Sequence, residues 1–285
     1  MRVLVLGATG MLGSTVFKYF SQLPNISTFG TVRSRGAFKY FDDEAASHLY
    51  TDVDVLDHDA LVQVLSRARP NVVINCIGLI KQFSDAKDPL RALPINSMLP
   101  HRLANICELI NARLIHVSTD CVFSGRKGMY TEDDVSDAED LYGKSKYIGE
   151  VTDRSHVLTL RTSIIGHELS SNASLVDWFL SQQGIVKGFT KAIFSGLTTL
   201  EVARVLKEFV LPAPQLHGLY HLSVNPIDKY SLLCEVAKVY GKDITIVPDS
   251  ALEIDRSLDS SRFRAAVGYT PPSWPELIQA MFLQK

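Results

Sequence analysis

Residues 2–13, Arg-Val-Leu-Val-Leu-Gly-Ala-Thr-Gly-Met-Leu-Gly, place a short apolar run before three glycines with GxxGxxG spacing. The apolar residues predict a buried strand, and the pattern at 12–20 predicts a helix. Glycines permit a tight turn and let backbone N–H groups approach a pyrophosphate at the positive helix end. The stretch therefore predicts a dinucleotide site. The expected contacts are Gly7, Thr9, Gly10, Met11, Leu12 and Gly13.

β-Branched runs alternate with helical patterns along the next part of the chain. Strands are expected at 27–32, 72–76 and 114–118, and helices at 60–67, 96–110 and 141–151. This order predicts an α/β protein with a Rossmann doubly wound parallel sheet. The pattern loosens after Arg161, so we expect a dinucleotide-binding domain at 1–165. A smaller C-terminal substrate lobe is expected at 166–285, with segments that return to the first domain.

Within the second half, the periodicity is weaker but still readable. Helices are expected near 173–183, 200–211 and 228–240, with a last helix from about Pro275. A strand is expected at 218–223, and 184–196 is a glycine-bearing segment without a clear period.

Composition narrows the function classes. The 285 residues carry a formal net charge of −2, which provides no basic field for nucleic acid. No apolar run is long enough for a membrane span, and the apolar N-terminus is too short for a signal peptide. Four cysteines lack CxxC spacing, and the histidines show no metal-ligand spacing. We therefore expect a cytoplasmic protein with free thiols and no metal. A homodimer is left open.

The end of the second strand indicates the preferred dinucleotide. An NAD enzyme carries a carboxylate there for the ribose 2′-hydroxyl, but this chain has no carboxylate before Asp42. Arg33, Ser34 and Arg35 stand there instead, and a guanidinium suits a 2′-phosphate. The sequence therefore favours NADP (NADPH), unless the arginines lie on a solvated loop.

Two residue groups predict the reaction chemistry. Tyr142 and Lys146 are four residues apart, so they share one face of a helix. A neighbouring ammonium stabilises a phenolate, which makes the pair an acid–base suited to carbonyl reduction. Thr119 ends the strand that precedes this helix, at the edge where α/β sheets bind ligands, and its hydroxyl can donate to a substrate carbonyl.

These motifs resemble extended short-chain dehydrogenases/reductases. Within that group, residues 118–150 look like the dTDP-4-dehydrorhamnose reductase branch, which reduces a 4-keto group on a nucleotide sugar. The resemblance implies Thr119, Tyr142 and Lys146 as the catalytic triad and Asn96 as the asparagine that helps hold the lysine. It also implies cofactor contacts at Asp54, Val55, Cys76, Ile77 and Gly78.

The likeness includes departures at sugar-facing positions. At the position of Cys121, the similar enzymes have a tyrosine. At the position of Ile164, they tend to have a tryptophan. We therefore favour a sister branch that reduces UDP-linked 4-keto-6-deoxy sugars, N-acetylated ones among them, for surface polysaccharides. The expected substrate contacts are Lys81, Asp120, Cys121, Phe123, Ile164, Ser195 and Gly196.

Two alternatives stay open. The first is a nucleotide-sugar epimerase or dehydratase, because the same triad serves those enzymes. The second is a non-catalytic regulatory subunit on the same fold. The acidic run 132–134 is expected to be a solvated loop face, and Thr198 or Thr199 is expected to cap a helix.

Overall fold

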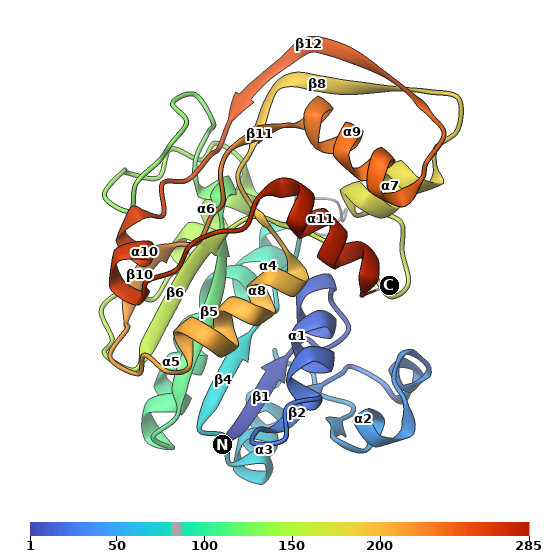
Figure 1. The fold of residues 1–285 in the computed structure, drawn as a ribbon. Helices are drawn as coiled ribbons and strands as arrows, with labels where there is room; N and C mark the ends of the chain where they lie inside the picture. The colour runs from blue at the N-terminus through green and yellow to red at the C-terminus, as the bar shows by residue number, and fades with distance from the viewer. Residues whose placement is uncertain (81–86, 285) are drawn as a thin grey trace. The chain divides into compact units, whose positions relative to one another are not determined.

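The computed structural model describes residues 1–80 and 87–284. Its main feature is a seven-stranded sheet with the order β10-β6-β5-β4-β1-β2-β3 (Figure 1). The strands are β1 Arg2–Leu6, β2 Ser27–Thr31, β3 Leu49–Tyr50, β4 Val72–Asn75, β5 Arg113–Thr119, β6 Val157–Thr162 and β10 Gly218–His221. Parallel pairing joins β3 to β2, β2 to β1, β1 to β4, and β4 to β5. This is the Rossmann arrangement, and it confirms the fold class predicted from the sequence.

Helices connect these strands. They are α1 Met11–Ser21, η1 Arg35–Tyr40, α2 Asp43–Ser47, α3 His58–Ala68, α4 Pro89–Ala92, the π-helix η3 Leu93–Met98, α5 Leu99–Leu109, η4 Asp120–Val122 and α6 Leu141–Ile148. The four residues of β1 that follow Arg2 are fully buried. Leucines and valines from β1, α3, β4, α5 and β5 pack together in one hydrophobic core. Burial of this apolar surface holds the sheet and these helices together.

The strand order reverses beside β1, whose neighbours are β2 and β4. Ligands of such sheets bind where the order reverses, beyond the carboxyl ends of the strands. The residues that follow β1 and β4 are Gly7 and Cys76. The fold therefore places the glycine turn at the expected ligand position.

Two compact units are present. One comprises 1–118, 139–160 and 213–219, and the other comprises 119–138, 161–212 and 220–285. The segment 119–138, which begins with the last residue of β5, is grouped with the C-terminal residues, whereas the domain expected at 1–165 is continuous. Contacts distant in sequence decide this grouping.

The second unit contains a three-stranded sheet in the order β11-β8-β12. β8 pairs antiparallel with β11 and parallel with β12, and α9 packs against β8 (Figure 1). The elements of this unit are β7 Ile164–Ile165, α7 Leu175–Ser181, β8 Ile185–Phe194, β9 Leu197–Thr198, α8 Thr199–Val205, the π-helix η5 Leu206–Val210, β11 Ile227–Asp228, α9 Lys229–Tyr240, β12 Thr245–Asp255, α10 Ser261–Val267 and α11 Trp274–Leu283.

The long strands β8 and β12 were not predicted. β12 is largely exposed, contains Pro248 and has a register shift between Asp249 and Glu253. These features remove the alternating pattern that identifies a strand in a sequence. The predicted helices near 200–211, 228–240 and 275 are present, and Thr198 caps α8 by accepting from the Glu201 N–H.

Candidate active site

The glycine turn after β1 has little space for side chains. Gly7 has φ of +83°, and a Cβ on Gly13 would lie 2.1 Å from the Gly7 carbonyl oxygen. A Cβ on Gly10 would lie 3.5 Å from the same oxygen, an ordinary contact. Gly10 is the N-cap of α1 and has no side chain to cap it. The first N–H groups of α1, at Met11 and Leu12, are therefore open to an anion.

The loop after β2 presents the two candidate arginines to solvent. Arg33, Ser34 and Arg35 are all exposed. Neither guanidinium forms a hydrogen bond or ion pair with any residue in 1–80 or 87–284. Both guanidinium groups are thus accessible to a phosphate. Asp54 is also exposed, and its carboxylate accepts from the Leu56 N–H at 2.9 Å.

The loop after β4 lies against this turn. A Cβ on Gly7 would come within 2.9 Å of the Ile77 side chain. A Cβ on Gly78 would lie 3.8 Å from Lys146 Nζ and 3.7 Å from Asn96 Oδ1. Burial raises the pKa of Cys76 to about 12, so its thiol stays protonated at neutral pH. Lys81, predicted to contact substrate, lies outside the described residues.

Asn96 joins this loop to α6. Its Oδ1 accepts from the Leu79 N–H at 2.8 Å, and its Nδ2 donates to the Leu79 carbonyl and to Ser145 Oγ, each at 3.1 Å. Ser97 Oγ also donates to the Ser145 carbonyl at 2.8 Å. Asn96 therefore positions the residue next to Lys146, without a direct bond to the lysine itself.

Tyr142 and Lys146 lie on α6 as predicted. Asp140 caps this helix by accepting from the Gly143 N–H at 2.8 Å. The spacing of four residues places both side chains on one helix face. Lys146 is buried, and its ammonium donates to the Val117 carbonyl of β5 at 2.9 Å. The helix and the strand together fix the position of this ammonium.

The buried surroundings of Lys146 lower the pKa of its ammonium group. Burial lowers the pKa of Lys146 to about 8, opposed by Glu150 and Cys76. His116, on β5, is buried too, and burial lowers its pKa well below the usual value, with a further contribution from Lys146. Asn75 Nδ2 lies 3.1 Å from His116 Nδ1. Near neutral pH, Lys146 thus carries the positive charge of this region while His116 is neutral.

Thr119 and the residues after it belong to the second unit. Thr119 Oγ1 accepts from the Cys121 N–H at 3.1 Å and donates to Asp120 Oδ1 at 3.2 Å. Burial raises the pKa of Asp120, and Arg256 is the largest influence that opposes the rise. Burial also raises the pKa of Cys121 to about 12. The thiol is therefore neutral, and it accepts from Arg256 Nη1 at 3.8 Å.

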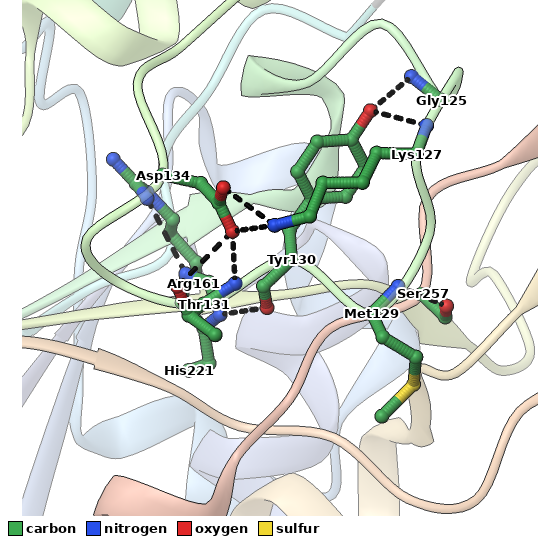
Figure 2. A network of polar contacts seen from close by, with 9 residues as sticks. All are labelled: Gly125, Lys127, Met129, Tyr130, Thr131, Asp134, Arg161, His221 and Ser257. Atoms are coloured by element: carbon green, nitrogen blue, oxygen red, sulfur yellow. Dashed lines mark hydrogen bonds and ion pairs between the residues drawn. The ribbon is translucent and has the colours of Figure 1, made fainter.

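Tyr130 anchors the segment that follows Thr119 (Figure 2). Its hydroxyl accepts from the N–H groups of Gly125 and Lys127, at 3.2 and 3.1 Å. Its carbonyl lies 3.0 Å from His221 Nδ1, and Arg161 Nη1 lies 3.3 Å from Nε2 of the same histidine. The first of these contacts attaches the loop to β10, and the second joins β10 to β6.

The buried ring of Phe123 belongs to the same anchor. It stacks on Tyr130 with 4.1 Å between centroids, and the Arg161 guanidinium lies 5.1 Å from its centroid. Phe123 therefore has a packing role, and the substrate contact predicted for it stays a prediction. One residue of the acidic run departs from the expected solvated face: the Glu132 side chain is 4% exposed and accepts from the His221 N–H, whereas Asp133 is 81% exposed.

Other predicted substrate residues hold segments together. Ser195 is buried, and its Oγ accepts from the Leu258 N–H at 2.9 Å. A Cβ on Gly196 would lie 2.1 Å from the Ser163 carbonyl oxygen. Ile164 is half-buried and pairs with Leu197. Ser195 and Gly196 thus lie in closely packed chain, and their substrate contacts stay predictions.

Sequence reasoning missed Lys229 and Arg256. Arg256 donates from Nε to the Phe123 carbonyl at 2.7 Å and contacts Cys121. Lys229 exerts an electrostatic influence on Asp120. The sequence contained one signal for Lys229. This lysine directly follows the N-cap residue Asp228, at a helix start where acidic residues are preferred to basic ones. Arg256 had no such signal.

No helix in the described part of the chain has the length and apolar character needed to cross a membrane. The Rossmann sheet, the glycine turn and the tyrosine–lysine pair on α6 define the extended short-chain dehydrogenase/reductase class. A family model described as RmlD substrate binding domain matches residues 1–284, and the chain belongs to that family.

Individual proteins extend this comparison. The chain is 27% identical to methionine adenosyltransferase 2 subunit beta of Mus musculus over 260 residues, 84% of this chain and 72% of that protein. It is 27% identical to the probable low-salt glycan biosynthesis reductase Agl14 of Haloferax volcanii over 310 residues, 99% of this chain and 97% of that one. The relatives thus include both a reductase and a subunit of another enzyme.

Solved structures share the fold. A dTDP-4-dehydrorhamnose reductase from Clostridium acetobutylicum superposes with a TM-score of 0.80 and 21% identity, and covers all of both chains. The dTDP-4-dehydrorhamnose reductase from Bacillus anthracis, solved in complex with NADP, gives a TM-score of 0.79 and 20% identity over 100% of this chain and 99% of that one.

Proposed function

We propose that this protein is an NADPH-dependent reductase of the 4-keto group of a nucleotide-linked 6-deoxy sugar. The observation that carries the proposal is the buried Lys146 ammonium, held by Val117 and four residues from Tyr142 on α6. The family, and the relative described as a probable reductase, support the same chemistry.

The residues after β1 and β2 fit NADPH. A side chain at Gly13 would close the glycine turn, so the turn keeps backbone N–H groups accessible to a diphosphate. Arg33 and Arg35 are exposed beyond β2, where a 2′-phosphate would need positive charge. The similar reductase from Bacillus anthracis was solved with NADP, which supports this choice.

The proposed reaction uses three side chains. Bound NADPH would supply a hydride to the keto carbon. Tyr142 donates its phenolic proton to the carbonyl oxygen, which becomes a hydroxyl, and Lys146 stabilises the resulting phenolate. Thr119 donates a hydrogen bond to the same oxygen as negative charge develops there. A proton from solvent then restores Tyr142.

The identity of the nucleotide-linked sugar is the most specific part of the proposal. Cys121 and Ile164, in place of two aromatic residues, favour a UDP-linked and N-acetylated 4-keto sugar over dTDP-4-dehydrorhamnose. A panel of dTDP- and UDP-linked 4-keto sugars, assayed by NADPH consumption, tests it. Turnover confined to dTDP-4-dehydrorhamnose would refute the UDP assignment. Two features of the protein stay predictions from the sequence: its role in surface polysaccharide synthesis and its cytoplasmic location.

A regulatory subunit is the second candidate, because the relatives include methionine adenosyltransferase 2 subunit beta. NADPH binding without turnover of any 4-keto sugar would favour it over the reductase. An epimerase or dehydratase would retain and recycle its NAD, so a purified protein active without added NADPH would favour that alternative.

A further inference from the structure

A group of charged side chains lies next to Thr119 in the second unit. Lys229, the first residue of α9, places its ammonium 4.2 Å from the centre of the Phe194 ring. Arg256, the residue directly after β12, contacts Cys121 and the Phe123 carbonyl. Both cations influence the carboxylate of Asp120. The group therefore combines two positive charges with one carboxylate.

The Lys229 ammonium has no hydrogen-bond acceptor among the residues that the structure describes. With the residues of 1–80 and 87–284 it forms neither a hydrogen bond nor an ion pair, so its contact with Phe194 is a cation–π interaction. Burial lowers the pKa of Lys229 to about 8, and Asp120 and Cys121 oppose that change. Lys229 is half-buried, and its ammonium offers three hydrogen-bond donors to the acceptor oxygens of a ligand.

The start of α9 adds to the positive potential. The N-cap residue Asp228 accepts from the Ser231 N–H at 2.8 Å and from Ser231 Oγ at 2.7 Å, so its carboxylate serves the helix. The helix dipole is positive at this end, where a lysine is disfavoured. Lys229 thus occupies a position that helix stability does not explain and that anion binding does.

Arg256 supplies the second cation. Its Nε is engaged by the Phe123 carbonyl at 2.7 Å, and Nη1 reaches the neutral thiol of Cys121. Within the described residues it makes no ion pair with Asp120 or another carboxylate. Its planar guanidinium is thereby oriented while its positive charge is not neutralised, which suits bidentate contact with an anion.

We propose that Lys229 and Arg256 form an anion-binding subsite, next to Thr119 and Asp120, for phosphate or carboxylate oxygens of the nucleotide-linked substrate. This inference rests on the proposed function and identifies the residues that recognise charge on that substrate. The two cations take the anionic oxygens, and Asp120 accepts from a neighbouring hydroxyl or amide N–H of the sugar.

Calorimetric titration of the full-length protein with NADPH present tests the subsite. The probes are UDP, dTDP and uridine, and the variants are Lys229→Met, Arg256→Met and the control Lys238→Met on the exposed side of α9. We expect each of the first two to weaken UDP or dTDP binding at least about tenfold, as for loss of a charge-assisted hydrogen bond. Uridine, NADPH and the control should be unaffected.

Two further ligands separate the sources of the anion. Weaker binding of UDP itself by Lys229→Met assigns the subsite to the diphosphate. Wild-type affinity for UDP and UDP-glucose with weaker binding of UDP-glucuronate assigns it to a sugar carboxylate. Wild-type affinity of Lys229→Met and Arg256→Met for all of these overturns the subsite.

Folding and the parent proposal have separate readouts. NADPH affinity and thermal unfolding report whether each variant is folded, and Lys229→Arg, which keeps the charge, should restore most of the affinity. If Lys229→Met does not fold, Lys229→Gln replaces it. Wild-type nucleotide affinity in both Arg256→Met and Lys229→Gln then overturns the subsite. A wild-type protein that binds none of the nucleotides contradicts the nucleotide-sugar function itself.

Discussion

The ammonium of Lys146 donates a hydrogen bond to the main-chain carbonyl of Val117, with 2.9 Å between Nζ and the oxygen. This contact between α6 and β5 thus fixes the position of the Lys146 ammonium. The sequence predicts only that Lys146 lies on a helix. Because the carbonyl is uncharged, the lysine keeps its positive charge for the phenol four residues away. The proposed chemistry depends on this arrangement.

Tyr142→Phe should lower kcat by on the order of 10²–10⁴-fold, because the ring stays while the transferable proton is lost. The affinity for NADPH should not change. Steady-state kinetics and cofactor titration measure the two effects. Tyr147→Phe, on the exposed part of the same helix, is the matched control and should behave as wild type. Near-normal turnover in Tyr142→Phe would remove this residue from the chemistry.

The pH profile of kcat should fall above pH 8, because the pKa of Lys146 is lowered to about 8. Loss of the ammonium removes the charge that stabilises the phenolate. Lys146→Arg, which remains charged, should move this limb to higher pH in whatever activity it retains. A flat profile through pH 10 in the wild type would contradict the assignment.

Stability should change with pH in the opposite direction. The folded pKa of Lys146, about 8, lies below the ordinary value of 10.5, so between these values only the unfolded chain keeps the proton. The free energy of unfolding contributed by this group therefore rises with pH, by on the order of 3 kcal/mol in total. Urea unfolding of wild type and Lys146→Met across this range should show the rise in the wild type alone.

Arg33→Ala and Arg35→Ala should weaken NADPH binding by about 10–100-fold if each guanidinium bonds the 2′-phosphate. NADH, which lacks that phosphate, should bind equally to both variants and the wild type. Fluorescence titration gives the dissociation constants, and Arg67→Ala, an exposed arginine on α3, controls for net charge. An unchanged preference for NADPH in both variants would show that these arginines do not select the 2′-phosphate.

The two glycines of the turn should respond differently to alanine. Gly13→Ala forces a Cβ to within 2.1 Å of a carbonyl oxygen, so we expect a loss of about 1–3 kcal/mol in unfolding free energy. Gly10→Ala meets only a 3.5 Å contact and should fold normally, yet bind NADPH less tightly because the methyl enters the phosphate space. Thermal unfolding and NADPH titration separate these results, and equal behaviour of the variants would contradict the model of the turn.

Tyr130→Phe should destabilise the second unit. The hydroxyl accepts from two main-chain N–H groups, and its removal leaves Gly125 and Lys127 without that acceptor (Figure 2). The expected loss is about 1–3 kcal/mol in the free energy of unfolding. Urea denaturation measures it, with Tyr147→Phe as the control, and unchanged stability would show that other groups satisfy these N–H donors.

The sequence by itself determined the Rossmann sheet, the glycine turn and the tyrosine–lysine pair, because each depends on residues only a few positions apart. Strand and helix periods, a helix start and an i,i+4 spacing are local properties, and they remain visible in one dimension.

Tertiary structure alone decided the rest. Lys229 and Arg256 lie more than a hundred positions from Asp120, yet both act on its carboxylate. The sequence also could not show that Glu132 is buried or that Ser195 accepts a main-chain hydrogen bond. Burial and electrostatic contact arise between segments far apart in the chain, so they exist only once the backbone has folded.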